Sequence, residues 1–186
     1  MFETKVREII ENNQEIMDVL TIIEELNLKE GCLCAGTIRN LIWQELFDDS
    51  KGSKILTDVD VIFFDPEMSY DEMLKREKEL NSNSPNYQWE LKNQVYMHVH
   101  HPNQTPYKSV EDAISNFPER CTAVGAYLKN GRLQLIAPFG WEDNITGVVR
   151  PTPSFSESLT HLAYYKKRVE SKDWQIRWPN LIIKEK

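Results

Sequence analysis

The segment over residues 55–64 constrains the fold of this chain more than any other, because it is the clearest strand in the sequence. It is rich in β-branched and aromatic residues, and Asp65-Pro66 ends it. Successive side chains of a strand point to opposite faces, so Asp58 and Asp60 share one face while Val59, Val61 and Phe63 share the other. The sequence therefore predicts a sheet that is buried on one side and carries two carboxylates on the other.

The pair formed by Asp58 and Asp60 has two interpretations. Two carboxylates side by side on a core strand repel each other, and a divalent cation relieves that repulsion; oxygen ligands alone favour Mg²⁺ or Mn²⁺. The alternative is a strand end at which both carboxylates are solvated, or one caps a turn. An isolated Asp-x-Asp is weak evidence for a metal site, but the very hydrophobic strand that follows this pair strengthens it.

The remaining pattern predicts an α+β fold, with a mixed, mostly antiparallel sheet flanked by helices. Apolar residues at helical spacing between Val6 and Leu26 predict an N-terminal helical element, interrupted at Asn12-Asn13. Strands are expected over 32–35, 55–64, 87–100, 122–128 and 132–136, the last two joined by an Asn130-Gly131 hairpin turn. A loop is expected over 48–54, and helices over 38–46, 69–80, 109–117 and around 159–169.

The expected strand over 87–100 supplies a candidate for a third carboxylate. Trp89 and Leu91 fall on its apolar face, whereas Glu90, Lys92 and His98 fall on its polar face. If this strand neighbours the first one, Glu90 lies beside the aspartates, and three carboxylates holding metal ions activate a hydroxyl for in-line attack on a phosphoryl group. The alternative for Glu90 and Lys92 is a cross-strand salt bridge at the surface.

The stretch Ala35-Gly36-Thr37-Ile38-Arg39-Asn40 predicts a tight strand-to-helix turn. Small residues let a phosphate approach the backbone, the helix N-terminus offers unpaired N–H groups, and Arg39 adds a fork of donors. The alternative is a turn that simply packs the helix on the sheet. Both interpretations remain open from this stretch alone.

Composition excludes several classes of protein. With 22 Lys+Arg against 29 Asp+Glu, the net charge is −7, which argues against a dedicated DNA binder. No apolar run is long enough to span a membrane, and no signal core opens the chain, so we expect a cytoplasmic protein. The three cysteines, Cys32, Cys34 and Cys121, lack zinc-ligand spacing and are expected to be reduced, mostly buried thiols.

Taken together, the turn with its following Arg and the Asp-x-Asp strand resemble the head domain of the nucleotidyltransferase superfamily, which includes poly(A) polymerases and CCA-adding enzymes. The chain more closely resembles a bacterial family of small nucleotidyltransferase-like proteins, over most of its length. The matching stretches are Ala35 to Asn40 with Trp43, Thr57 to Val61, Trp89 to Gln94 with Met97-His98, Phe117-Pro118-Glu119, Ala137 to Gly140, Arg150 to Pro153, and Trp178-Pro179.

This resemblance implies a transferase that moves a nucleoside monophosphate from a nucleoside triphosphate, such as ATP, to an acceptor, with Mg²⁺ or Mn²⁺. It implies that Asp58, Asp60 and Glu90 are the catalytic and metal-binding carboxylates. Nucleotide binding is then expected at Gly36, Thr37, Arg39, Asn40 and Lys92. The acceptor, whether small molecule, protein or RNA, is left open, and neither DNA nor a membrane is expected as a partner.

The sequence departs from the CCA-adding pattern at two positions of the turn. Ala35 replaces the first Gly and adds a Cβ, and Asn40 replaces an Asp that could orient Arg39. We expect residues 1–30 to form the N-terminal helical element, 31–150 the nucleotidyltransferase-like core, and 151–186 a C-terminal helix and Trp-rich tail of the same domain. That C-terminal part is too short to form the tRNA-gripping body of CCA-adding enzymes.

Three further features are interpreted conservatively. His98 and His100 suit zinc only weakly and are expected to belong to a polar sheet face. The basic run Lys166-Lys167-Arg168 is expected to be a solvated helix face, with guidance of an RNA or a phosphorylated acceptor as the alternative. Trp174 and Trp178 are expected to pack the tail onto the core. Two other functions therefore stay open: a catalytically silent nucleotide-sensing or protein-binding module on the same fold, and an RNA-binding accessory protein.

Overall fold

A five-stranded sheet organises the protein in the computed structural model, which describes residues 1–47, 58–100 and 105–186. The strand order is β3-β2-β1-β4-β5; β2 and β3 run parallel, and the other neighbours run antiparallel. The strands are β1 (Cys32–Cys34), β2 (Asp58–Phe63), β3 (Gln88–Asn93), β4 (Gly125–Lys129) and β5 (Arg132–Ile136). The mixed, mostly antiparallel sheet is thus confirmed, whereas the expected loop 48–54 and positions 55–57 lie outside the described residues.

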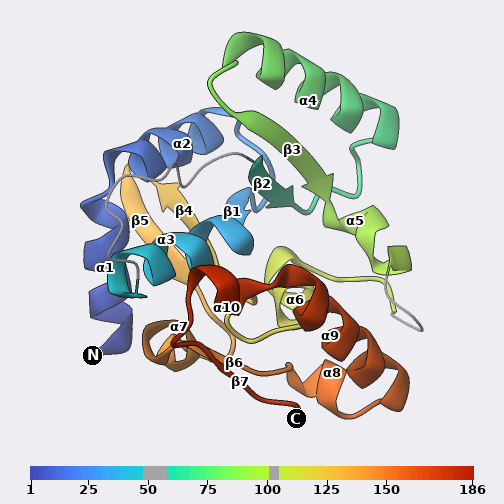
Figure 1. Ribbon diagram of the computed structural model, residues 1–186. Helices are drawn as coiled ribbons and strands as arrows, with labels where there is room; N and C mark the ends of the chain where they lie inside the picture. The colour runs from blue at the N-terminus through green and yellow to red at the C-terminus, as the bar shows by residue number, and fades with distance from the viewer. Residues whose placement is uncertain (48–57, 101–104) are drawn as a thin grey trace.

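Four helices from the first half of the chain build the main core. They are α1 (Phe2–Glu11), α2 (Gln14–Glu25), α3 (Gly36–Phe47) and α4 (Tyr70–Asn83). The interruption at Asn12-Asn13 is confirmed, because the Asn13 side chain accepts a hydrogen bond from the Ile16 N–H and caps α2. Ser69 caps α4 in the same way. Figure 1 shows α4 lying along β3, at one edge of the sheet.

The two faces of the sheet have different roles. Leu33, Val61 and Leu91 point to the face that packs against the helices of the main core. Cys34 and Ile62 point to the opposite face, which α6 (Val110–Ser115) covers in part through Ile114. The alternation therefore directs Asp60, Glu90 and Lys92 to this second, less covered face.

The expected long strand over 87–100 is wrong in its second half. The strand ends at Asn93, and the chain turns into α5 (Gln94–Met97) and a 3₁₀ helix, η1 (His98–His100). Asn93 causes this turn, because its Oδ1 accepts from the N–H of Val95 and also from the N–H of Asp65. The alternation beyond position 93 is therefore accidental, and His98 and His100 do not share a strand face with Glu90.

The C-terminal third packs against α3 (Figure 1). It contains α7 (Glu142–Thr146), α8 (Pro153–Ser156), α9 (Leu159–Lys172) and α10 (Trp174–Arg177), and a small parallel ladder of β6 (Val148–Val149) with β7 (Ile182–Ile183). Trp174 and Trp178 lie edge-on to Trp43 of α3, so the expected packing of the tail is confirmed. Within the described ranges, no helix is both long and apolar enough to cross a membrane.

Candidate functional site

The register between β2 and β3 brings acidic residues from both strands together. In this parallel pair, Asp60 lies opposite Glu90 and Ile62 lies opposite Lys92. The expected neighbourhood of Glu90 and the aspartates therefore exists for Asp60. Asp58 opens β2 and is exposed, two residues before Asp60 on the same face.

Lys92 lies between the two facing carboxylates. Its Nζ is 2.5 Å from Asp60 Oδ1 and 2.7 Å from Glu90 Oε2. Burial opposes the charge on Lys92, but the two carboxylates raise the pKa of this ammonium above its ordinary value. The hydrogen bond from Lys92 lowers the pKa of Glu90 in turn. Lys92 and Glu90 are thus both charged at neutral pH.

The donor set at this point suits a divalent cation. Asp60 and Glu90 already hold one cationic group between their oxygens. Mg²⁺ is commonly bound by only one or two carboxylates, with waters completing its octahedral shell. Over 1–47, 58–100 and 105–186, no group of three or more His, Cys, Asp or Glu side chains is placed to hold a metal. In this arrangement Asp60 and Glu90 form a two-carboxylate centre, and Asp58 lies outside it.

The strand-to-helix turn adopts an unusual backbone conformation. Ala35 has φ 57°, in the left-handed region that a side chain disfavours, and α3 begins at Gly36. An added Cβ on Gly36 would meet only the end of the Arg39 side chain, at 3.6 Å. Thr37 is buried and donates its hydroxyl to the backbone carbonyl of Asp58, 3.3 Å away. The turn is therefore tied directly to the start of β2.

Arg39 is engaged inside the protein. Only 5% of the residue is exposed, and its guanidinium lies 4.4 Å from the ring centroid of Trp174. Nη1 donates to the Thr122 hydroxyl at 2.7 Å, while Nε and Nη2 both donate to Asn40 Oδ1. The structure therefore uses Arg39 to join α3 to the C-terminal segment, and Asn40 orients it without a charge.

A pocket of about 320 Å³ adjoins the acidic pair. Asp60 and Lys92 line one side of it, and Tyr164 and Arg168 of α9 line another. The remaining lining residues come from β1, its following turn, β2, α5, and the segments around α6 and β4: Cys34, Ala35, Ile62, Gln94, Met97, Tyr107, Phe117, Pro118 and Thr122. The pocket thus combines charged groups beside the sheet with aromatic and thioether groups opposite them.

The three cysteines are all buried and free, as expected. Cys34 lies in the floor of the pocket, where burial raises the pKa of its thiol well above the ordinary value. Burial likewise raises the pKa of Cys121, to about 12. Thiols with such pKa values remain protonated at neutral pH and are poor nucleophiles.

Sequence reasoning missed the part that α9 plays in this pocket. It placed Arg168 in a solvated basic run, but Arg168 Nε donates to Glu119 Oε1 at 2.6 Å. Glu119 is wholly buried. The available signal was the four-residue spacing of Tyr164 and Arg168, which puts an aromatic group and a guanidinium on one helix face. Lys166 and Lys167, in contrast, are exposed as expected.

Comparisons with known proteins place this chain in a known class, that of the nucleotidyltransferases. A model of the family described as Nucleotidyltransferase matches residues 21–183. The chain belongs to this family. A comparison with curated proteins gave no significant match.

Solved structures show the same fold. A protein whose NMR structure reveals a CCA-adding enzyme head domain is 46% identical, with a TM-score of 0.87, over 97% of this chain and 95% of the other. A structure of a tRNA-processing enzyme complex and a tRNA nucleotidyltransferase crystallised with a primer tRNA and an incoming ATP analogue are 16% and 15% identical, with TM-scores of 0.55 and 0.51. Each match covers 89% of this chain but only 43% and 46% of those chains, and shows the fold alone.

Proposed function

We propose that this protein transfers a nucleoside monophosphate from a nucleoside triphosphate to an acceptor hydroxyl, with Mg²⁺ bound at Asp60 and Glu90. The observation that carries this proposal is the pairing of these carboxylates across β2 and β3, beside a pocket. Membership of the nucleotidyltransferase family and the similarity to a CCA-adding enzyme head domain support it.

Different parts of the site are proposed to bind the phosphates, the metal and the nucleoside. Gly36 and Thr37 open α3 next to the pocket, where backbone N–H groups of the helix N-terminus suit a phosphate oxygen. Asp60 and Glu90 provide the negative charge that holds the metal, which when bound neutralises charge on the phosphates and lowers the pKa of a coordinated hydroxyl. The aromatic side of the pocket provides surface for the nucleoside.

The reaction that these residues support is an in-line displacement. The acceptor oxygen forms a bond to the α-phosphorus, the bond from that phosphorus to the bridging oxygen breaks, and pyrophosphate leaves. The hydroxyl proton passes to a carboxylate of the site. Lys92 pairs with both carboxylates and keeps them ionised and close together until a metal replaces its charge.

An NMR titration tests the nucleotide and metal parts of the proposal. Each of the four ribonucleoside triphosphates is added with and without Mg²⁺, and amide shifts are expected at Cys34, Gly36 and Asp60 only when Mg²⁺ is present. Incubation with α-³²P-labelled triphosphates and cell extract then identifies the acceptor. Asp60→Asn should abolish labelling, whereas Asp71→Asn, on the exposed side of α4, should leave it unchanged.

One observation favours a second candidate, a catalytically silent nucleotide-sensing module. Lys92 already neutralises Asp60 and Glu90, so the chain can hold this carboxylate pair without a metal. Triphosphate binding that is equally tight with and without Mg²⁺, together with no labelled acceptor, would support this candidate and contradict the transferase.

A further inference from the structure

The C-terminal helix α9 forms a basic wall of the pocket. Tyr164 and Arg168 line the pocket, and Lys172 follows after one more interval of four residues, so the three lie along one face of the helix. The pKa of Lys172 is lowered by burial and by the nearby Arg168 guanidinium, while Asp60 acts in the opposite direction. The four-residue spacing therefore puts Lys172 on the face of α9 that carries Tyr164 and Arg168, next to the pocket.

The Nε edge of the Arg168 guanidinium is bound to a buried carboxylate, which fixes the orientation of the side chain. Its Nε donates to Glu119 Oε1 at 2.6 Å, and Glu119 itself is 0% exposed. A β-bridge between Glu119 and Pro151 anchors the backbone at this point. Within the described part of the chain, the two terminal amino groups of Arg168 make no hydrogen bond, and its side chain remains partly exposed. Glu119 therefore presents a guanidinium fork with free donors to the pocket.

The other basic groups near the pocket are already used. Lys92 is paired with two carboxylates, and the three nitrogens of Arg39 all donate within the protein. A nucleoside triphosphate carries about four negative charges at neutral pH and needs cationic partners for the phosphates that leave as pyrophosphate. A planar, pre-oriented Arg fits two phosphate oxygens at once.

We propose that Arg168, with Lys172 one turn further along α9, binds the polyphosphate of a nucleoside triphosphate across the pocket from Asp60. Glu119 is a positioning residue that holds Arg168 for this contact. This inference rests on the proposed function, and it assigns to the C-terminal helix the phosphate contact that the sequence predicted for Arg39.

The variants must separate phosphate binding from folding. Arg168→Gln alone leaves the Glu119 carboxylate buried and unpaired, which can prevent folding. The double variant Glu119→Gln/Arg168→Gln removes both charges and is compared with Glu119→Gln alone, which keeps the guanidinium. Lys172→Gln changes an exposed residue and leaves the packing intact.

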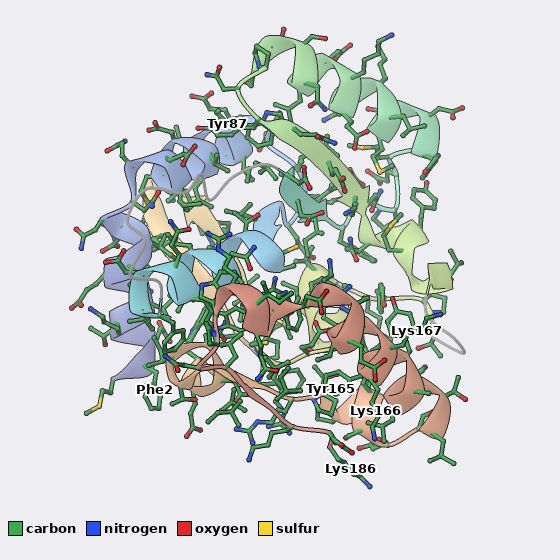
Figure 2. The ribbon with its side chains drawn as sticks, in the orientation of Figure 1. Phe2, Tyr87, Tyr165, Lys166, Lys167 and Lys186 are labelled. Atoms are coloured by element: carbon green, nitrogen blue, oxygen red, sulfur yellow. The ribbon has the colours of Figure 1, made fainter. Side chains whose placement is uncertain are left out.

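Lys166→Gln is the matched control for charge on the same helix. Lys166 lies about half a turn from Arg168, and its Nζ is 3.0 Å from Glu185. Tyr165, beside it, donates its hydroxyl to the carbonyl oxygen of Lys184 at 2.7 Å. Figure 2 labels both residues on α9, and this side of the helix faces the C-terminal segment.

Dissociation constants are measured by calorimetry for inorganic tripolyphosphate, the four ribonucleoside triphosphates and the corresponding nucleosides, with Mg²⁺. Relative to Glu119→Gln, the double variant should bind the triphosphates and tripolyphosphate about tenfold more weakly or worse, and nucleosides within about twofold. Lys172→Gln should weaken triphosphate binding by about two- to fivefold. Lys166→Gln should bind like the wild type.

The outcomes distinguish this inference from the proposed function. If the wild type binds triphosphates at the Asp60 site and the double variant binds them equally well, α9 has no phosphate contact and the ion pair is purely structural. If the wild type binds no triphosphate at all, the proposed function fails together with this inference.

Discussion

Lys92 Nζ lies 2.5 Å from Asp60 Oδ1, so a lysine ammonium occupies the space between carboxylates of two parallel strands. Glu90 Oε2 is 2.7 Å from the same nitrogen. The ammonium relieves the repulsion between the two carboxylates in the ligand-free chain. A divalent cation must therefore compete with a positive charge that the protein itself supplies, and Lys92 must move for a metal to be bound by both oxygens.

Lys92→Gln is expected to increase the affinity for Mn²⁺ in the absence of nucleotide by about tenfold, because it removes this competing charge. Mn²⁺ binding is followed by electron paramagnetic resonance of the free ion. Lys75→Gln, on an exposed part of α4, is the control and should leave the affinity unchanged. Equal or weaker Mn²⁺ binding by Lys92→Gln would show that the ammonium does not compete with the metal.

Ala35→Gly is expected to stabilise the protein by about 0.5–1 kcal/mol. The left-handed backbone at Ala35, with φ 57°, strains a residue with a Cβ, and this relief exceeds the entropy that Gly adds to the unfolded chain. Urea unfolding at constant m-value measures the change. Ala163→Gly is the control. Ala163 is solvent-exposed and lies within α9, away from its ends, so the change should destabilise the protein by about 1 kcal/mol.

Much of the fold could be predicted because local chemistry decides it. Ser69 caps α4, and Asn130 and Gly131 both adopt positive φ in the predicted hairpin turn. The alternation around Asp60 correctly gave the face of β2, since one buried face fixes the register of a strand.

The failures arose where one side chain has contacts distant in sequence. Asn93 reads as one more strand residue, but its bonds to Asp65 and Val95 stop β3 and start a helix. Arg39 stays a predicted phosphate ligand, but the sequence did not reveal its contacts with Thr122 and Trp174. The sequence pattern alone does not reveal such partners, because they are set by tertiary packing.

Side chains of α4 form hydrogen bonds with the backbone of β3, which is an edge strand of the sheet. Asn81 accepts a hydrogen bond from the N–H of Trp89 at 3.0 Å and donates to its carbonyl at 2.9 Å. Glu77 Oε2 accepts from the N–H of Leu91 at 2.7 Å. Four residues of a helix rise about 6.0 Å, and two residues of a strand rise about 6.6 Å. The spacing from Glu77 to Asn81 on α4 therefore matches the spacing from Leu91 to Trp89 on β3.

Asn81→Ala is therefore expected to destabilise the protein by about 1–3 kcal/mol, because two backbone groups of Trp89 lose their partners. The unpaired edge should also promote self-association, which sedimentation velocity detects. Ser82→Ala is the control, since its exposed hydroxyl donates to the Lys78 carbonyl within the helix and not to β3 among the described residues. A stable, monomeric Asn81→Ala variant would contradict the role assigned to α4.

The stability of the protein should fall as pH rises above about 9, because burial makes its thiols ionise at higher pH in the folded state than in the unfolded chain. Burial raises the pKa of Cys121 to about 12, although the nearby Arg39 charge acts in the opposite direction and Glu119 adds to the increase. A group whose pKa is higher in the folded state stabilises below its unfolded pKa and loses that contribution above it. For Cys121 the loss is about 1.4 kcal/mol for each pH unit between roughly 9 and 12.

Urea unfolding of the wild type and of Cys121→Ala between pH 8 and pH 10 measures this contribution. The variant has a cavity and is expected to be less stable at every pH, so the informative quantity is the slope of the unfolding free energy against pH. The slope of Cys121→Ala should be shallower above pH 9, while the remaining pH dependence is common to both proteins and cancels in the difference. Parallel slopes would mean that the Cys121 thiol ionises equally easily in the folded and unfolded chains, and that α3 and the C-terminal segment do not exclude water from it.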